Sequence, residues 1–254
     1  MTASLWFITF LSLLLAGCSS RIEEEASRMS VRMSDGSAPS DSSSGSGEPD
    51  LREVVVLVHG MGRSGDSMKP LGESLATAGY EARVFDYDSF GAEAAESAVA
   101  LRTLLGELDA DGSIAGIHLV GHSLGGILAR MALIDAPPER FGRLVMLAPP
   151  NQGSGWARVL GPALSRWIPP LDDLSNEEGS VVRSLPAPTG YQLGVIAARF
   201  DGKVSVEATH VEGESDHLVV NGVHSFLMKQ DEVQRQVAWF LREGSFERAP
   251  SREE

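Results

Sequence analysis

From residue 52 onward, apolar runs typical of buried strands alternate with the apolar spacing typical of helices. Residues 53–59, EVVVLVH, are almost continuously apolar, which predicts a strand covered on both faces. By the same criteria, strands are predicted over 80–85, 114–120, 143–147, 191–198 and 204–211. Helices are predicted over 67–78, with Pro70 in its first turn and Gly79 at its end, and over 92–108, 125–135 and 233–241. This alternation predicts right-handed crossovers, a parallel sheet, and a ligand site at the carboxyl ends of the strands.

The N-terminal 51 residues have a different character. Residues 5–15, LWFITFLSLLL, are apolar but too short a run to span a bilayer as a helix. Leu15-Ala16-Gly17-Cys18 follows at once and indicates a secretory signal of the lipoprotein type, although MTAS before the run has no basic residue. An ordinary signal peptide or an uncleaved anchor are the alternatives. Residues 19–51 are rich in Ser, Gly and acidic residues and predict a disordered tether.

The Leu15–Cys18 stretch resembles the bacterial lipobox, which implies that Cys18 becomes the lipidated first residue of the mature protein. Cys18 is the only cysteine, so no intrachain disulfide can form. Ser19, by resemblance to enteric lipoproteins, points to the outer membrane. We therefore expect an envelope protein of a bacterium, tethered by lipid at the periplasmic face of a membrane, with a globular domain over 52–243 and a polar tail over 244–254.

Charge and composition limit the classes of partner that this protein is expected to bind. The net charge is −14, with 21 basic against 35 acidic residues, which argues against nucleic acid and against charge-driven docking on anionic lipid. No cofactor is predicted, and HGMGRSGD at 59–66 is not a phosphate loop because it lacks the Lys-Ser/Thr ending. No metal site is predicted either. Asp86 and Asp88 could hold a cation, but two acids in a polar loop are more often solvated or capping.

The candidate chemistry is centred on GHSLG at 121–125, between a predicted strand and a predicted helix. A serine at such a turn, with glycine two positions away on each side, is typical of a nucleophile elbow. The glycines allow a strained turn and close packing, and the helix N-terminus offers amides to a developing oxyanion. The alternative is a structural glycine turn that carries no chemistry.

Four motifs occur in an order that points to one family. They are VLVHGMG at 56–62, GHSLGG at 121–126, LAPPNQGS at 147–154 and DGKVSVEAT at 201–209, followed by His224. In this order the chain resembles an α/β-hydrolase of the small bacterial lipase and esterase type, over residues 53–243. The resemblance implies a compact α/β fold of about six mainly parallel strands flanked by helices, with a short lid-like insertion.

The resemblance also implies roles for single residues. The implied nucleophile is Ser123, the general base is His224, the acid is Asp201, and the oxyanion-hole amides belong to Met61 and Leu124. A serine hydroxyl needs a base near neutral pH, and the base needs a carboxylate that fixes its tautomer.

Alternatives to these partners stay open. The rival base is His217, and the rival acids are Asp216 and Glu207. The other histidines, His59, His122 and His210, are expected to be structural: His59 in the oxyanion loop, His122 beside the nucleophile and His210 inside a strand.

The irregular segment 149–190 is a candidate lid. Apolar residues at helical spacing include two tryptophans, and Gly161-Pro162 predicts two short helices with a kink. This face either packs on the core or lines an acyl-binding cleft. Asn151, Gln152 and Trp156 are the predicted substrate contacts, and the alternative for 148–154 is a turn.

These observations together predict a serine hydrolase that cleaves small-molecule or lipid carboxylic esters through an acyl-enzyme on Ser123. An acyltransferase or amidase with the same triad is the alternative, and a non-catalytic lipoprotein of this fold is a further one. The oligomeric state is left open.

Overall fold

A computed structural model describes residues 51–134, 137–153 and 181–248, which all fall within one compact unit, Glu48–Glu254. Strands and helices alternate along the described chain, as the sequence predicts. The strands are β1 (Arg52–Val58), β2 (Glu81–Phe85), β3 (Ile114–His122), β4 (Phe141–Leu147), β5 (Gln192–Ala198) and β6 (Asp216–Val220). The helices are η2 (Gly65–Met68), α2 (Lys69–Thr77), α3 (Ala94–Ala110), α4 (Leu124–Ala132), α7 (Val181–Ser184), α8 (Val206–Thr209), η3 (His224–Lys229) and α9 (Asp231–Glu243).

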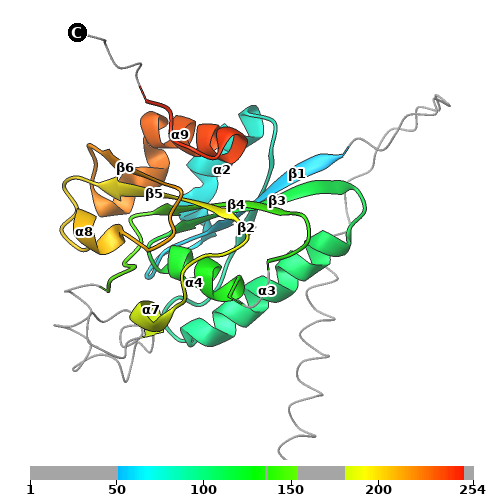
Figure 1. Ribbon diagram of the computed structural model, residues 1–254, viewed down its shortest axis with the longest axis horizontal. Coiled ribbons are helices and arrows are strands. Elements are labelled where there is room, and N and C mark those ends of the chain that lie inside the picture. Colours follow the sequence, from blue (N-terminus) through cyan, green and yellow to red (C-terminus); the bar gives the residue numbers. More distant parts are fainter. Residues whose placement is uncertain (1–50, 135–136, 154–180, 249–254) are drawn as a thin grey trace, which may run out of the picture. The chain divides into compact units, whose positions relative to one another are not determined.

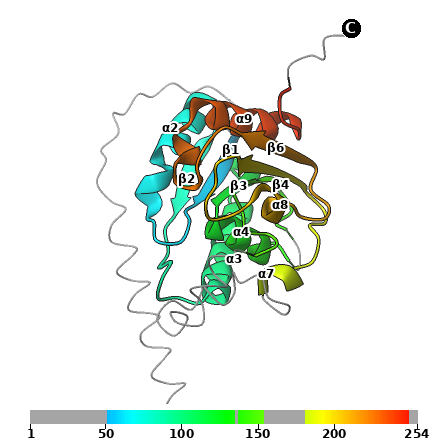
Figure 2. The same ribbon diagram turned by 90° about the vertical axis from the view of Figure 1, so that its left-hand side faces the viewer.

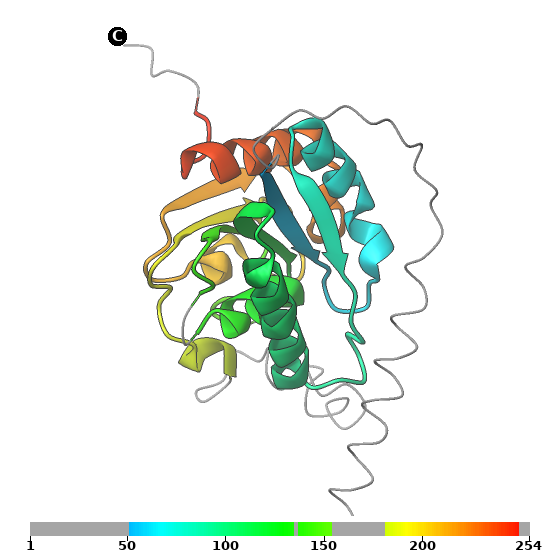
Figure 3. The same cartoon turned by 90° about the vertical axis from the view of Figure 1, so that its right-hand side faces the viewer.

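The six strands form one sheet in the order β2-β1-β3-β4-β5-β6, and every neighbouring pair is parallel. This confirms the predicted α/β fold of about six parallel strands. The strand order reverses between β1 and β3, and in open α/β sheets ligands bind at the carboxyl ends of the strands beside such a reversal. Figure 3 shows β2, in cyan, at the edge of the sheet next to β1.

Helices cover both faces of the sheet. Helices α3 and α4 lie on one face, and α2 and α9 lie on the other (Figures 1 and 2). Alternate residues of β1 supply the two layers: Val54, Val56 and Val58 pack with the α3/α4 side, whereas Val55 and Leu57 pack with the α2/α9 side. This explains why the β1 sequence is continuously apolar.

One predicted strand is wrong. Residues 204–211 form a turn and the short helix α8, and the sixth strand is instead β6, at 216–220. The V-S-V-E alternation suggested a strand, but Ser205 caps α8 through a bond from the Ala208 amide to its Oγ (3.3 Å). As a result, His210 lies just after α8 and not inside a strand.

Two predicted features lie outside the residues that the structure describes. The apolar stretch predicted as lid helices, with Trp156, lies almost wholly in residues 154–180, and Cys18 lies in residues 1–50. Among the described residues, no helix has both the length and the apolar content needed to cross a bilayer.

Candidate active site

Ser123 occupies the sharp turn between β3 and α4. Its φ of 53° and ψ of −120° lie in a region that non-glycine residues rarely adopt, so the turn is strained. The amide of Ser123 donates to the carbonyl of Leu147 at the end of β4 (2.8 Å), which holds the strained residue against the sheet. The side chain is partly exposed, so an incoming molecule can reach it.

The glycines around Ser123 are required by close packing. A Cβ on Gly121 would lie 2.5 Å from the Gly125 carbonyl oxygen and from the Gly126 Cα and amide nitrogen. A Cβ on Gly125 would overlap the carbonyl oxygens of Val58 and His59, at the end of β1. The elbow thus presses α4 against two strands at once, and only glycine fits at both positions.

His224 and Asp201 meet Ser123 from two other loops. His224 follows β6, is 7% exposed, and places its Nε2 3.0 Å from the Ser123 Oγ. Its Nδ1 lies 2.7 Å from the Asp201 Oδ2, where only a protonated Nδ1 can donate to the carboxylate. In the neutral ring Nε2 is then the acceptor for the serine hydroxyl. The three side chains form one hydrogen-bonded relay.

Asp201 is held as a carboxylate. It follows β5, and its Oδ1 accepts the amides of Lys203 (2.8 Å) and Val204 (2.9 Å). Burial opposes its ionisation, but the hydrogen bonds from His224 and from these two amides outweigh burial and hold the pKa of Asp201 below its ordinary value. The group is therefore negative at neutral pH and able to stabilise a protonated His224.

The two expected oxyanion donors follow neighbouring strands in matching positions. Val58 of β1 pairs in register with Gly121 of β3, and Met61 and Leu124 each come three residues later. Leu124 is the first residue of α4, and the first amides of an α-helix have no acceptor within the helix. The amide of Gly62, beside Met61, donates to the Oγ of Ser89 (3.0 Å) and fixes this turn.

The loop after β2 supports the loop that carries Met61. Buried His59 stacks on Tyr87 with ring centroids 4.4 Å apart, and the Tyr87 hydroxyl donates to the His59 carbonyl (2.9 Å). Asp86 accepts the Gly65 amide (3.0 Å) and lies 2.9 Å from the His59 Nε2. Asp88 accepts two amides of its own loop. Both aspartates therefore hold loops in place.

His122 packs against His224, on the loop that carries the base of the relay. Its Nε2 donates to the backbone carbonyl of His224 (2.9 Å), and the two rings are 5.0 Å apart between centroids. Burial, and then the neighbouring His224, lower the pKa of His122 to about 3, so this imidazole is neutral. It orients the loop of His224 and does not contact Ser123 by any hydrogen bond in the described part of the chain.

The rival partners are engaged elsewhere. Asp216 and His217 begin β6, at the opposite end of that strand from the one that His224 follows. Asp216 accepts two bonds from Arg248 (2.6 and 2.7 Å), and the Nε2 of His217 lies 2.9 Å from the Thr209 Oγ1. Glu207 is exposed on α8. The structure brings none of the three rivals into the relay.

Asn151 and Gln152, two of the predicted substrate contacts, are bonded within the protein. Asn151 is 2% exposed and bridges Arg130 Nη1 (2.8 Å) and the Thr209 carbonyl (2.7 Å). Gln152 donates through its Nε2 to the His210 carbonyl (3.1 Å). These contacts favour the alternative of a structural turn for the described part of this stretch, residues 148–153.

Sequence reasoning missed Arg130. This side chain of α4 is 5% exposed and donates to Asn151 and to the carbonyls of Leu185 (3.3 Å) and Pro186 (3.0 Å). It thereby joins the two chain segments that flank residues 154–180. A single cation within the apolar run GGILARMAL was the available signal.

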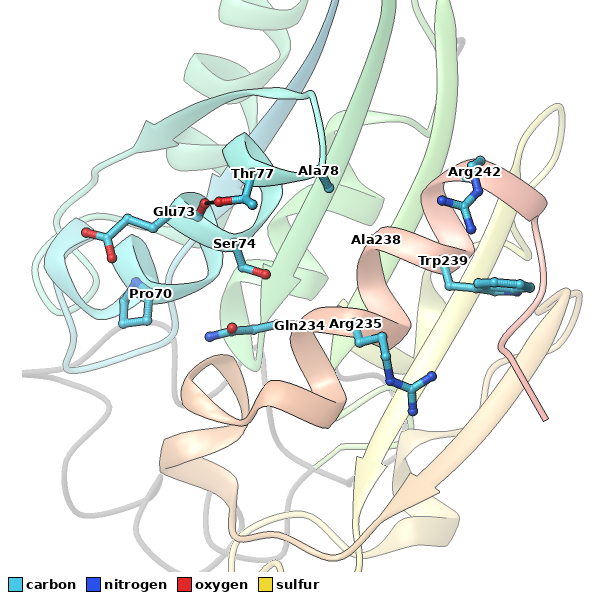
Figure 4. A pocket seen from close by; sticks show the side chains of 10 residues that line it. All are labelled: Pro70, Glu73, Ser74, Thr77, Ala78, Gln234, Arg235, Ala238, Trp239 and Arg242. Carbon is cyan, nitrogen blue, oxygen red and sulfur yellow. Dashed lines mark hydrogen bonds between the residues drawn. The ribbon is translucent and has the colours of Figure 1, made fainter. Parts of the chain in front are cut away.

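A groove of about 580 Å³ lies on a different part of the surface, between α2 and α9 (Figure 4). Ser74 and Thr77 of α2 and Arg235, Trp239 and Arg242 of α9 are among the residues that line it. None of the relay residues lines this groove, so it is not the site of the Ser123 chemistry.

Comparisons with known proteins agree with the fold. The family model described as "Alpha/beta hydrolase family" matches residues 55–245. No curated protein gives a significant sequence match. Among solved structures, the mature lipase BlEst2 of Bacillus licheniformis superposes with a TM-score of 0.58 at 18% identity, covering 79% of this chain and 96% of that one.

Two further solved structures superpose with a TM-score of 0.55 at 20% identity, each over 76% of this chain. They are a monoacylglycerol lipase of Paleococcus ferrophilus, covered over 95% of its chain, and a thermophilic esterase of Thermogutta terrifontis, covered over 91%. At these identities the likeness is one of fold.

Proposed function

Because this chain belongs to the alpha/beta hydrolase family, we propose that it is a serine hydrolase that cleaves carboxylic esters through an acyl-enzyme on Ser123. The observation that carries the proposal is the relay, with 3.0 Å between the Ser123 Oγ and the His224 Nε2 and 2.7 Å between the His224 Nδ1 and Asp201. A hydroxyl bonded to the lone pair of an oriented imidazole is set up for proton removal during attack on a carbonyl.

The proposed first step forms the acyl-enzyme. As the Ser123 Oγ attacks the ester carbonyl carbon, the His224 Nε2 takes the hydroxyl proton, and Asp201 stabilises the imidazolium. The oxygen that becomes negative accepts hydrogen bonds from the amides of Met61 and Leu124. When the tetrahedral intermediate collapses, the bond to the alcohol oxygen breaks, and His224 gives that oxygen the proton.

The second step releases the acid. Water attacks the acyl-enzyme carbonyl while His224 takes one of its protons, and collapse returns that proton to the Ser123 oxygen. Esters are proposed over amides because the site motifs resemble those of lipases and esterases, and because similar folds include proteins described as lipases and an esterase. The likeness to those proteins supports ester cleavage by analogy of fold.

Hydrolysis of p-nitrophenyl esters from acetyl to palmitoyl by the purified full chain tests the proposal. We expect turnover that Ser123→Ala reduces by at least about 10³-fold, because the acyl-enzyme can no longer form. Ser113→Ala is the matched control, since Ser113 immediately precedes β3, whereas Ser123 immediately follows it. Equal activity of the Ser123→Ala variant and the unchanged chain would contradict the proposal.

We also propose, from the sequence, that Cys18 carries the lipid that tethers the enzyme at the periplasmic face of a bacterial membrane. Metabolic labelling with a palmitate analogue in a bacterial host tests this. The unchanged chain should take up label and sediment with membranes, whereas Cys18→Ala should take up none. Labelling of the Cys18→Ala variant would contradict the proposal.

A further inference from the structure

Three metal-ligating side chains gather on the segment that leads from α8 into β6. His210 follows α8, Glu214 lies in the connecting turn, and His217 is the second residue of β6. The ligand atoms that these residues offer lie within 4.8 Å of one another. We propose that His210, Glu214 and His217 bind a zinc ion, at a site separate from the Ser123 relay and independent of the proposed hydrolysis.

The donor set suits zinc. Two imidazole nitrogens and one carboxylate oxygen, with water in the fourth position, form a common tetrahedral zinc sphere. With metal–ligand bonds of about 2.0–2.2 Å, neighbouring ligand atoms of such a sphere are about 3.3 Å apart. The His210 Nδ1 and the Glu214 Oε1 are closer together than this, at 2.6 Å. All the ligand atoms of the set lie within 4.8 Å of one another, so the set brackets the spacing that zinc requires.

Hydrogen bonds already orient two of the three ligands. Thr209 gives its only hydroxyl hydrogen to the Val206 carbonyl (2.6 Å), so at 2.9 Å its Oγ1 accepts from a protonated His217 Nε2. In neutral His217 this leaves the Nδ1 lone pair available to a metal. The Glu214 Oε2 accepts the Val211 amide (3.2 Å), which leaves Oε1 for coordination. Such outer bonds to ligating residues are usual at protein metal sites.

Coordination requires one movement. The rings of His210 and His217 stack with centroids 3.8 Å apart and planes 19° apart. A metal lies in the plane of each imidazole that binds it, so the two rings must turn away from each other. The His210 ring can turn because its side chain is 52% exposed. The Glu214 side chain is only 16% exposed and is the more fixed of the two ligands.

The ion would connect the end of α8 to the start of β6. This segment lies between Asp201 and His224 in the chain, so a cross-link here would restrain the stretch that joins the two partners of Ser123. The expected role is therefore structural, with a higher unfolding temperature when zinc is bound.

Zinc binding to the full chain tests the inference directly. The protein is stripped with EDTA, and binding of ZnCl2 is followed by isothermal titration calorimetry and by metal analysis after dialysis. We expect one zinc per chain. Binding should be at least about 100-fold weaker in His210→Ala and Glu214→Gln, since even loss of an outer-shell partner weakens metal affinity by about 10–100-fold. Glu212→Gln is the matched control, because Glu212 is an exposed acid of the same turn outside the cluster.

Two further variants keep the test independent of folding. Thr209→Ser should retain affinity because the hydroxyl remains, whereas Thr209→Val should bind zinc about 10–100-fold more weakly. Zinc should raise the Tm of the unchanged chain but not that of His210→Ala. No zinc uptake by the unchanged chain at micromolar concentrations would overturn the inference, as would equal affinity in His210→Ala, which would place the metal on other histidines.

Discussion

Replacing Gly121 by alanine should force the backbone of the elbow apart. The new Cβ would lie 2.5 Å from the Gly125 carbonyl oxygen, the Gly126 Cα and the Gly126 amide nitrogen. All three atoms belong to the backbone of the first turn of α4, which cannot yield as a flexible side chain can. Overpacking of this kind costs about 1–3 kcal/mol, and we expect the upper end, about 3 kcal/mol.

Gly106→Ala is the control for this prediction. Gly106 lies in the middle of α3 and is exposed, and an added Cβ would meet nothing within 4 Å beyond its chain neighbours and the backbone of its own helix. Alanine is about 1 kcal/mol better than glycine inside a helix, so this variant should gain stability. For a domain of this size each kcal/mol moves Tm by about 2–4 °C. Gly121→Ala should therefore melt about 6–12 °C lower than the unchanged chain, and Gly106→Ala about 2–4 °C higher.

Thermal and urea unfolding followed by circular dichroism measures both variants, with ester hydrolysis as a second readout. Gly121→Ala should lose activity even where it is folded, because relief of the clash moves α4 and therefore the Leu124 amide. A Gly121→Ala variant with unchanged Tm and unchanged activity would refute the packing argument for the elbow.

Three other results are expected. Asp201→Asn should fold but lower kcat by about 10⁴-fold, because an amide cannot fix the His224 tautomer or stabilise the imidazolium. Ester hydrolysis kinetics measure this, and a loss of kcat under tenfold would contradict it. The native pKa of His122, about 3, lies below the unfolded value of 6.5, so stability is lost as pH falls below 6.5. Between pH 7.5 and 5 this amounts to about 2 kcal/mol, and urea unfolding of His122→Gln should show that much less pH dependence. Arg130→Met should cost about 3 kcal/mol in urea unfolding by leaving the buried Asn151 amide oxygen without its donor, and a neutral effect would contradict the role of Arg130 as a link between segments.

The sequence predicted the core of the fold well, because the central strands are covered on both faces and so consist of long apolar runs. β1 and β3 are of this kind, and the glycine pattern around Ser123 located the turn between β3 and α4. β6 was missed because it is a short strand whose residues up to Val219 are only partly buried. Residues 204–211 were predicted as the last strand instead. They contain a short helix, because the Ser205 side chain caps α8.

The supporting contacts of the site were beyond sequence reasoning. Arg130 finds its acceptors at Leu185 and Pro186, more than fifty residues away in the chain. The His210–Glu214–His217 cluster was hidden by the wrong strand, since a strand over 204–211 would have separated His210 from His217. In both cases the missing information was which loops the fold brings together.

Covalent labelling of the nucleophile tests the central claim most directly. The full chain is treated with a fluorophosphonate, and the adduct is located by intact mass and peptide mass spectrometry, beside Ser123→Ala. We expect one adduct per chain, on the peptide that contains Ser123, and none in the variant. An adduct on another residue, or ester hydrolysis by a chain that takes up no label at Ser123, would contradict the account.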